Sequence, residues 1–342
     1  MSFKGIKVNV ITGFLGAGKT TLIKQLLGQV PNGESWAVLV NEFGEIGIDG
    51  LLLETDNIAI KQVPGGCLCC VSSAAFTVGL NELIKKAKPT RIIIEPTGLG
   101  HPQQIMQQLL APHYHDVLDV KAATCLIDVR NLSDPRYLGH PAFFDQIEQA
   151  DVLVASKADL YSDDDEQRFL AFAKQFADEK SVVALSANGS FDLKWLDMQT
   201  KHVIHAHDHD HDHDHDHDHD HDHDHDHDHG IDITRTVIAE GVIRYQKRDG
   251  EFISVGWFSE RALSTSDDRF DQLVAALKSI KSFWRFKGVV DVEGITIAVN
   301  ITAKETAIYP EDKLVTSRFE CIFSDHDDIS SILKTIETTF LN

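Results

Sequence analysis

The sequence predicts an α/β protein with three parts: a mostly parallel sheet, a His/Asp-rich linker, and a small α+β C-terminal domain. Three observations lead to this prediction. Strand-like apolar runs alternate with helix-like segments in the first part, a strict His–Asp repeat interrupts the chain, and locally paired strands with two helices follow. We expect domains at 1–199 and 233–342, with the linker at 200–232.

The first part contains six near-continuous apolar runs, which are typical of parallel strands buried on both faces. The expected strands are Lys7–Thr12, Trp36–Asn41, Arg91–Glu95, Ala123–Asp128, Asp151–Ser156 and Ser181–Ser186. Helices are expected at Lys19–Leu27, Ser73–Lys88 and Asp163–Ala177. This alternation implies a parallel sheet with helices on both faces.

The last part has a different pattern, in which strands follow one another directly. The expected strands are Thr236–Tyr245, Phe252–Ser259, Phe283–Val292, Ile295–Thr302 and Arg318–Phe323. Glu293-Gly294 predicts a tight hairpin turn, and Asp267–Lys281 and Asp327–Phe340 are patterned as amphipathic helices. A small α+β domain follows from this order.

The amino-acid composition argues against two classes of protein, those that bind nucleic acid and those that span a membrane. The net charge is -21, but eleven aspartates of the repeat account for about half of it, so the remainder is only mildly acidic. This balance argues against nucleic-acid binding, which needs a basic face. No apolar run reaches the ~18–20 residues that span a bilayer, and the first residues lack the pattern of a signal peptide. We therefore expect a cytoplasmic protein without a membrane partner.

A phosphate-binding loop is predicted by Gly13-Phe14-Leu15-Gly16-Ala17-Gly18-Lys19-Thr20, which matches G-x-x-x-x-G-K-[ST] between a strand and a helix. Glycine N–H groups and the helix N-terminus cradle phosphate in such loops. Lys19 would reach the β- and γ-phosphates, and Thr20 would bind Mg²⁺. The alternative is a glycine-rich turn that matches by chance. The nucleotide contacts expected here are Gly13, Gly16, Ala17, Gly18, Lys19, Thr20 and Thr21.

Two further segments complete a nucleotide site. Glu95 ends an apolar strand and would hold the Mg²⁺ shell or position water, which makes it a catalytic candidate with Lys19. Gly98 would meet the γ-phosphate with its N–H. Glu95 stands where an aspartate is usual, and the alternative is a carboxylate that merely caps the strand.

Ser156-Lys157-Ala158-Asp159 corresponds to the Asn-Lys-x-Asp run of many GTPases. Asp159 would accept hydrogen bonds from the two guanine donors that adenine lacks, and the stem of Lys157 would lie over the base. Ser186 and Ala187 would form the loop that offers an N–H to guanine. Ser156 in place of asparagine shortens or removes one supporting hydrogen bond, so adenine stays an alternative.

The run Gly65-Gly66-Cys67-Leu68-Cys69-Cys70 places three thiols within four positions. In a reducing compartment such a cluster is typical of a metal or catalytic site. Three thiolates suit a tetrahedral Zn²⁺ and leave one position open. The alternative is a set of small buried residues after a Gly-Gly turn. Cys125 and Cys321 lie in apolar strands and are expected in the core.

These motifs, with Asn41-Glu42-Phe43-Gly44, Asp49 and a His-rich linker, occur in an order that resembles the CobW-type metallochaperone GTPases. Ser156 and Gly98-Leu99-Gly100-His101-Pro102 are most similar to the YeiR-type zinc-binding members. The resemblance extends over nearly the whole chain. It implies a P-loop NTPase fold, GTP hydrolysis coupled to metal handling, zinc on Cys67, Cys69 and Cys70, and Glu42 near that metal.

Asp49 fits a switch-loop acid near Mg²⁺, against the alternative of a surface turn before Gly50. The His–Asp tract contains twelve imidazoles, which bind zinc, nickel, copper and cobalt. It would be a low-affinity metal reservoir, or else a solvated spacer. Its candidate ligands are His207, His209, His211, His213, His215, His217, His219, His221, His223, His225, His227 and His229.

The sequence therefore predicts a zinc-binding GTPase that couples hydrolysis of GTP to metal transfer, with GTP, Mg²⁺ and Zn²⁺ as its cofactors. Expected partners are zinc or another divalent transition metal, a client metalloprotein and a second copy of the chain. Two other functions stay open. One is a nucleotide-regulated metal buffer, and the other is a P-loop ATPase or kinase in which the cysteines are structural.

Overall fold

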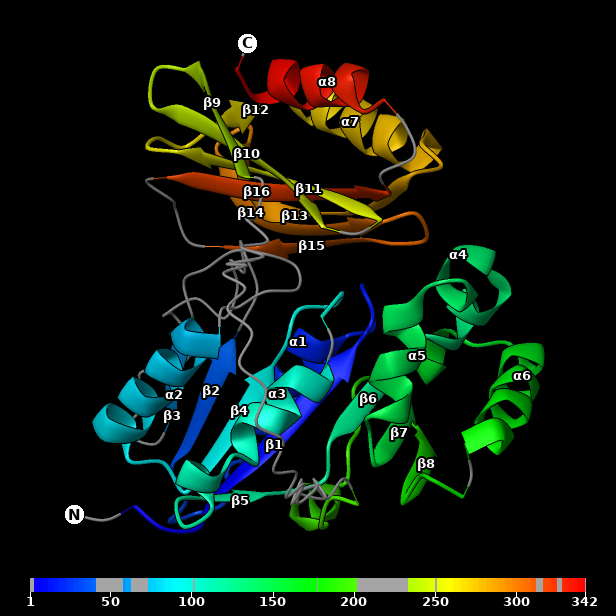
Figure 1. Cartoon of the computed structure of the whole chain (residues 1–342). Coiled ribbons are helices and arrows are strands. Elements are labelled where there is room, and N and C mark those ends of the chain that lie inside the picture. Colours follow the sequence, from blue (N-terminus) through cyan, green and yellow to red (C-terminus); the bar gives the residue numbers. More distant parts are fainter. Residues whose placement is uncertain are drawn as a thin grey trace, which may run out of the picture.

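The computed structural model describes residues 3–40, 58–62, 73–100, 102–176, 178–201, 233–249, 251–311, 316–324 and 328–341. These residues form two eight-stranded sheets (Figure 1). One sheet is parallel, and the other is largely antiparallel. The predicted fold class is thereby confirmed. Within these ranges, no helix is long and apolar enough to cross a membrane.

The parallel sheet has the strand order β3-β2-β4-β1-β6-β7-β8, and β5 also pairs with β1. Its strands are β1 (Ile6–Gly13), β2 (Trp36–Val40), β3 (Ile58–Gln62), β4 (Arg91–Glu95), β5 (Leu118–Val120), β6 (Thr124–Ile127), β7 (Val152–Ala155) and β8 (Val182–Leu185). The chain order reverses at the central strand β1. Ligands of open α/β sheets bind at such a reversal, beyond the carboxyl ends of the strands.

Helices cover both faces of this sheet. The helices of the parallel-sheet domain are α1 (Lys19–Leu27), α2 (Ser73–Ala87), α3 (Pro102–Leu109), α4 (Pro135–Leu138), α5 (Pro141–Glu148) and α6 (Asp163–Ala173). Val10 of β1 packs in one core cluster with Phe76 of α2, whereas Ile11 packs in another with Ile23 of α1. Adjacent β1 residues thus enter opposite cores, which explains why β1 is buried along nearly its whole length.

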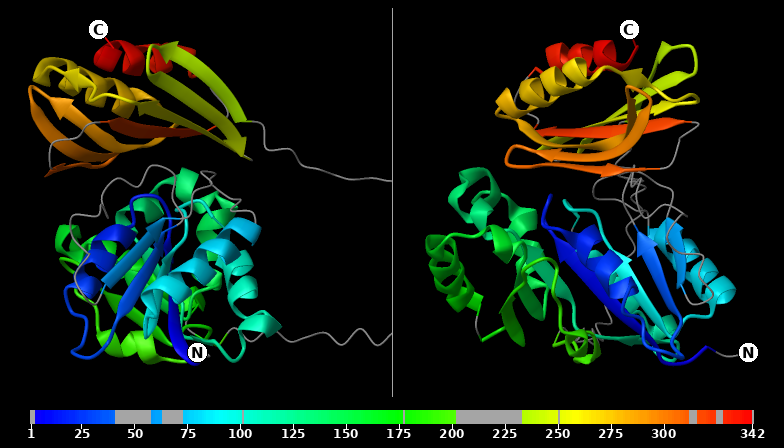
Figure 2. Two further views of the ribbon diagram at one scale, coloured as in Figure 1. Left: turned by 90° about the vertical axis from the view of Figure 1, so that its left-hand side faces the viewer. Right: turned by 180° about the vertical axis from the view of Figure 1, so that it is seen from behind.

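The C-terminal domain is the second sheet with two helices on one face. Its strand order is β15-β14-β13-β16-β11-β10-β9, and β12 pairs with β13. The elements are β9 (Ile233–Ala239), β10 (Val242–Asp249), β11 (Phe252–Ser259), β12 (Ser264–Thr265), α7 (Asp267–Ser279), β13 (Phe283–Val292), β14 (Ile295–Thr302), β15 (Thr306–Pro310), β16 (Ser317–Ser324) and α8 (Ser330–Leu341). Figures 1 and 2 show α7 and α8 on the face turned away from the parallel sheet.

One predicted strand of this domain was wrong. Residues 236–245 form parts of two antiparallel strands, β9 and β10, joined by a turn at Gly241, where φ is 70°. A residue without a Cβ adopts this conformation readily, and it ends the first strand. The turn predicted at Glu293-Gly294 is confirmed, since the two residues have φ values of 52° and 86°. Strands β3, β5, β12 and β15 were not predicted.

Aromatic side chains join the two sheet domains. The ring of Phe14 lies with its centroid 5.5 Å from that of Trp284 and 5.3 Å from that of Tyr137. The guanidinium of Arg136 lies 5.0 Å from the centre of the Trp284 ring and donates to the carbonyl oxygen of Lys281 at 2.9 Å. Phe14 belongs to the glycine-rich loop, so the C-terminal domain packs directly on that loop.

Candidate functional site

The glycine-rich loop joins the carboxyl end of β1 to the first turn of α1. Gly13 has φ 145°, and a Cβ on it would lie 2.5 Å from the carbonyl oxygen of Leu126. Gly18 has φ 92° and is the N-cap of α1. Only glycine fits both positions, because one lacks space and the other has left-handed backbone. The loop therefore turns its backbone toward the N-terminus of α1, where N–H groups have no acceptor within the helix.

Lys19 crosses the loop. Its side chain is buried, and its ammonium donates to the carbonyl oxygen of Gly13 at 2.8 Å. A Cβ on Gly98 would lie 3.2 Å from this ammonium. Gly98 and Lys19, which are both predicted to contact the γ-phosphate, thus lie side by side. A positive charge, a helix N-terminus and backbone N–H groups meet here, as phosphate binding requires.

Thr20 and Glu95 also meet. The hydroxyl of Thr20 donates to Glu95 Oε1 at 3.0 Å, and Glu95 is only 1 % exposed at the end of β4. A hydroxyl and a carboxylate are the hard oxygen ligands that Mg²⁺ prefers. The residues present therefore fit a bound Mg²⁺ beside the phosphate loop. The longer side chain of glutamate reaches the helix directly, which explains how it can stand where aspartate is usual.

Sequence reasoning missed Gln146, which orders the loop after β4. Its amide nitrogen donates to the carbonyl oxygens of Gly98 at 3.0 Å and Gly100 at 3.1 Å, and the side chain is fully buried. Gln146 lies on α5, 46 positions from Gly100. A lone glutamine in an amphipathic helix carries no signal of this role, so only the structure reveals it.

The base-recognition segments come together at the ends of β7 and β8. The Asp159 carboxylate accepts from the Asn188 N–H at 2.8 Å, and the Ala158 N–H donates to the carbonyl oxygen of Ser186 at 2.9 Å. The loop that holds Ser186 and Ala187 therefore lies against the Asp159 segment. This proximity is what a guanine site needs, with a carboxylate on one side and backbone N–H groups on the other.

Ser156 is buried, and its hydroxyl donates to the carbonyl oxygen of Ala17 at 2.7 Å. The serine that replaces asparagine therefore still connects the base-recognition run to the phosphate loop. This contact does not test whether serine shortens or removes a supporting hydrogen bond, so the preference for guanine over adenine stays a prediction.

The predicted zinc ligands, the histidines of the His–Asp tract and the second Mg²⁺ candidate, Asp49, lie outside the described residues. They are Glu42, Asp49, Cys67, Cys69, Cys70 and the twelve histidines of His207–His229. In the part of the chain that the structure describes, no group of three His, Cys, Asp or Glu side chains could hold a metal. Cys125 and Cys321 are buried core residues as expected, and burial raises the pKa of the Cys125 thiol to about 12.

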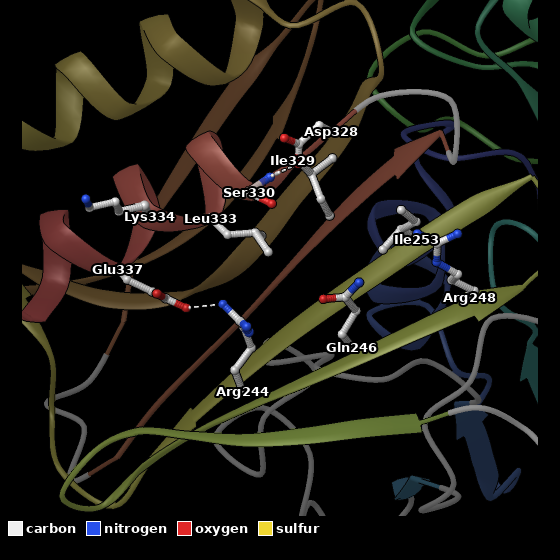
Figure 3. Close-up of a pocket in the computed structure, with 10 residues that line it drawn as sticks. All are labelled: Arg244, Gln246, Arg248, Ile253, Asp328, Ile329, Ser330, Leu333, Lys334 and Glu337. Atoms are coloured by element: carbon white, nitrogen blue, oxygen red, sulfur yellow. Dashed lines mark hydrogen bonds and ion pairs between the residues drawn. The ribbon is translucent and has the colours of Figure 1, made fainter.

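A separate pocket lies in the C-terminal domain between β10 and α8, with a volume of about 440 Å³ (Figure 3). Arg244, Arg248 and Lys334 line it together with Glu337 and Asp328. Arg244 already donates to Glu337 at 2.8 Å, so the wall contains a matched ion pair. The mixed charge selects no ligand class, and this pocket adds nothing to the phosphate site.

The fold and the loop geometry define a P-loop nucleotide-binding protein. Residues 7–184, more than half of the chain, match the CobW/HypB/UreG nucleotide-binding domain, and the chain belongs to this family. Residues 151–288 also match the ZrgA family of zinc uptake proteins, over a shorter range that contains the whole His–Asp repeat.

Two curated proteins are similar to this chain in sequence. "Zinc chaperone YeiR" of Escherichia coli K12 is 44% identical over 197 residues, which cover 58% of this chain and 60% of that protein. "Zinc chaperone CobW" of Pseudomonas aeruginosa is 31% identical over 185 residues, 45% and 49% of the two chains. The chain thus matches about half to three fifths of these relatives' length. The solved structure of Zn(II)-bound YjiA GTPase from E. coli has 17% identity and a TM-score of 0.41, over 98% of this chain and 99% of that one.

Proposed function

We propose that this protein is a GTPase that couples hydrolysis of GTP to the binding and transfer of zinc. Two groups of residues carry the proposal. Lys19, Thr20 and Glu95 lie together at the ends of β1 and β4, and Asp159 and the Asn188 N–H lie together at the ends of β7 and β8. Phosphate, cation and base thus each have a matching group at one edge of the sheet. Zinc is supported by the thiols of the sequence and by the names of the relatives.

The chain's own residues would act as follows. The Lys19 ammonium leaves the Gly13 carbonyl for the β- and γ-phosphates, and backbone N–H groups of the loop hold the other phosphate oxygens. Thr20 and Glu95 supply the oxygens that hold the cation, which neutralises developing negative charge when it is bound. Gln146 fixes the Gly98 loop beside the γ-phosphate. Asp159 selects guanine through two charge-assisted hydrogen bonds.

The decisive experiment is the metal stoichiometry of the purified protein, with and without a non-hydrolysable GTP analogue, alongside its rate of GTP hydrolysis. Tight zinc at one equivalent whose affinity changes with the analogue supports coupling. Many bound ions with no response to nucleotide would instead support the metal buffer. Equal hydrolysis of ATP and GTP would support the ATPase or kinase alternative. A client metalloprotein, self-association and a cytoplasmic location stay predictions.

Asp159→Asn should weaken GDP binding by about 100-fold, because an amide cannot accept from both guanine donors. The same amide can donate to the extra carbonyl oxygen of xanthine, so the variant should bind XDP better than the wild type does. Calorimetric titration of both nucleotides measures the change. Asp163→Asn, which removes an exposed carboxylate from the first turn of α6, is the matched control. Unchanged GDP affinity in Asp159→Asn would refute the guanine assignment.

Deleting His207–His229 should remove most weakly bound zinc while one tight site and the GTPase activity survive. Thiolates form a compact site, whereas the tract loses conformational entropy when it wraps an ion. Competition with a chromophoric chelator resolves the two affinity classes. A variant with serine at the twelve histidine positions keeps the length and the aspartates. Loss of the tight site in both variants would show that imidazoles of the tract belong to it.

A further inference from the structure

The C-terminal domain contacts the nucleotide site at two places. The first is the phosphate loop, where Phe14 packs on Trp284 and Thr302 Cγ2 lies 3.3 Å from the position of a Cβ on Gly16. The second is the base-recognition segment, where Glu305 meets Lys157. These contacts come from the start of β13, the end of β14 and the turn that follows β14. One edge of the C-terminal domain therefore lies against the nucleotide site.

A cluster of four charged side chains makes the second contact. The Lys157 ammonium donates to Glu305 Oε2 and lies 3.8 Å from Asp128 Oδ2. Arg130 Nη2 lies 2.6 Å from Asp128 Oδ2 and 3.6 Å from Glu305 Oε2. The hydrogen bond with Asp128 raises the pKa of Arg130. The charges of two cations and two carboxylates therefore compensate one another where the two domains touch. Asp128, one of the two carboxylates, is only 6 % exposed.

Glu305 is held in place by its own surroundings. It lies in the turn between β14 and β15, and its N–H donates to the Thr302 hydroxyl at 3.2 Å. The neighbouring Lys304 ammonium donates to the carbonyl oxygen of Arg130, which fixes the turn against the parallel-sheet domain. The carboxylate is thus presented to Lys157 by a short, tethered turn.

Lys157 is held at both ends. Its backbone has φ 58°, a left-handed conformation, and the next N–H donates to the Ser186 carbonyl in the adjacent loop. Its ammonium is held by the C-terminal domain. The stem between these ends is the part expected to lie over the base. A lysine fixed at both ends loses less side-chain entropy when a base binds against it.

We propose that Glu305 is a positioning residue for the nucleotide: it holds the Lys157 ammonium from the C-terminal domain and so keeps the lysine stem ordered over the base. This rests on the proposed function, because it requires a guanine nucleotide beside Asp159. Base binding and contact between the domains are then one coupled event.

The test compares GDP affinity by calorimetry and the KM and kcat for GTP in wild type and Glu305→Gln. Glutamine keeps the shape and removes the charge, so affinity should fall on the order of fivefold. KM for GTP should rise by the same factor with kcat unchanged, since the phosphate end is untouched. Glu251→Gln, at an exposed glutamate between β10 and β11, is the matched control and should change neither value.

A double-mutant cycle separates positioning from a merely structural role. Lys157→Met keeps an unbranched stem without the charge, so Glu305→Gln should have no further effect in that background. Equal losses in both backgrounds would overturn the proposal, as would unchanged or tighter GDP binding in Glu305→Gln. Absence of guanine-nucleotide binding in wild type would instead refute the proposed function itself. Thermal unfolding of each variant confirms that it is folded.

Discussion

Lys19→Ala should abolish GTP hydrolysis while zinc stays bound. The ammonium is the positive charge placed beside Gly98 and across the loop, where negative charge develops on the transferred phosphoryl group. Losing one such group costs about 10²–10³ in turnover at preorganised sites. Single-turnover hydrolysis measures the rate, and zinc stoichiometry is measured on the same preparation.

Lys24→Ala is the matched control for this change, because Lys24 is an exposed lysine in the last turn of the same helix, α1. It should hydrolyse GTP at the wild-type rate. Lys19→Ala should stay folded, since the Lys19 ammonium donates to the carbonyl oxygen of Gly13 in the loop rather than to a group of the core. Near-normal turnover in Lys19→Ala would disprove the phosphate-site assignment, and loss of zinc would show that the loop also supports the metal site.

The elements that the sequence predicted well are those with long apolar runs. Strands β11, β13 and β14 and helix α1 have the predicted bounds, because each is buried along its length or ends at a capping glycine or polar residue. β5 is only three residues long, too short for periodicity to detect. β3 (IAIKQ) is as long as β4, but it is only partly buried and lacks the continuous apolar run of β4. The β9–β10 turn was missed although Glu240-Gly241 has the same residues as the turn recognised at Glu293-Gly294.

Within the candidate site, the sequence predicted the residues of continuous motifs better than the residues that join them from distant parts of the chain. The phosphate loop is one continuous segment, so its chemistry is readable from residue types and spacing. The partners that the sequence did not reveal are distant along the chain: Gln146 is 48 positions from Gly98, and Glu305 is 148 positions from Lys157. A surface glutamate in a hairpin turn has no sequence signature that distinguishes it from any other. Only the docking of the second domain on the loop gives Glu305 its role.

Changing Cys69 and Cys70 to serine should remove the coupling between zinc and nucleotide while the loop still binds GTP. The cysteine run follows β3 in the chain, and β3, β2 and β4 are adjacent parallel strands whose carboxyl ends share the edge that holds Glu95. The chain after β4, which holds Gly98, therefore leaves the sheet at the same edge at which β3 ends. An ion bound by these thiols and a γ-phosphate would bias one structural equilibrium.

Linkage requires that the effect be reciprocal: if GTP changes the affinity for zinc, zinc changes the affinity for GTP by the same factor. A coupling of about 1–3 kcal/mol, or about 5- to 150-fold, is expected for such a pair of sites. The measurement is a titration of a non-hydrolysable GTP analogue with and without one equivalent of zinc, in wild type and in the double variant. Cys125→Ser, at a buried core thiol, is the cysteine control and should preserve the coupling. Equal affinities with and without zinc in the wild type would mean that the two sites act independently, because a ligand that binds both states equally shifts no equilibrium.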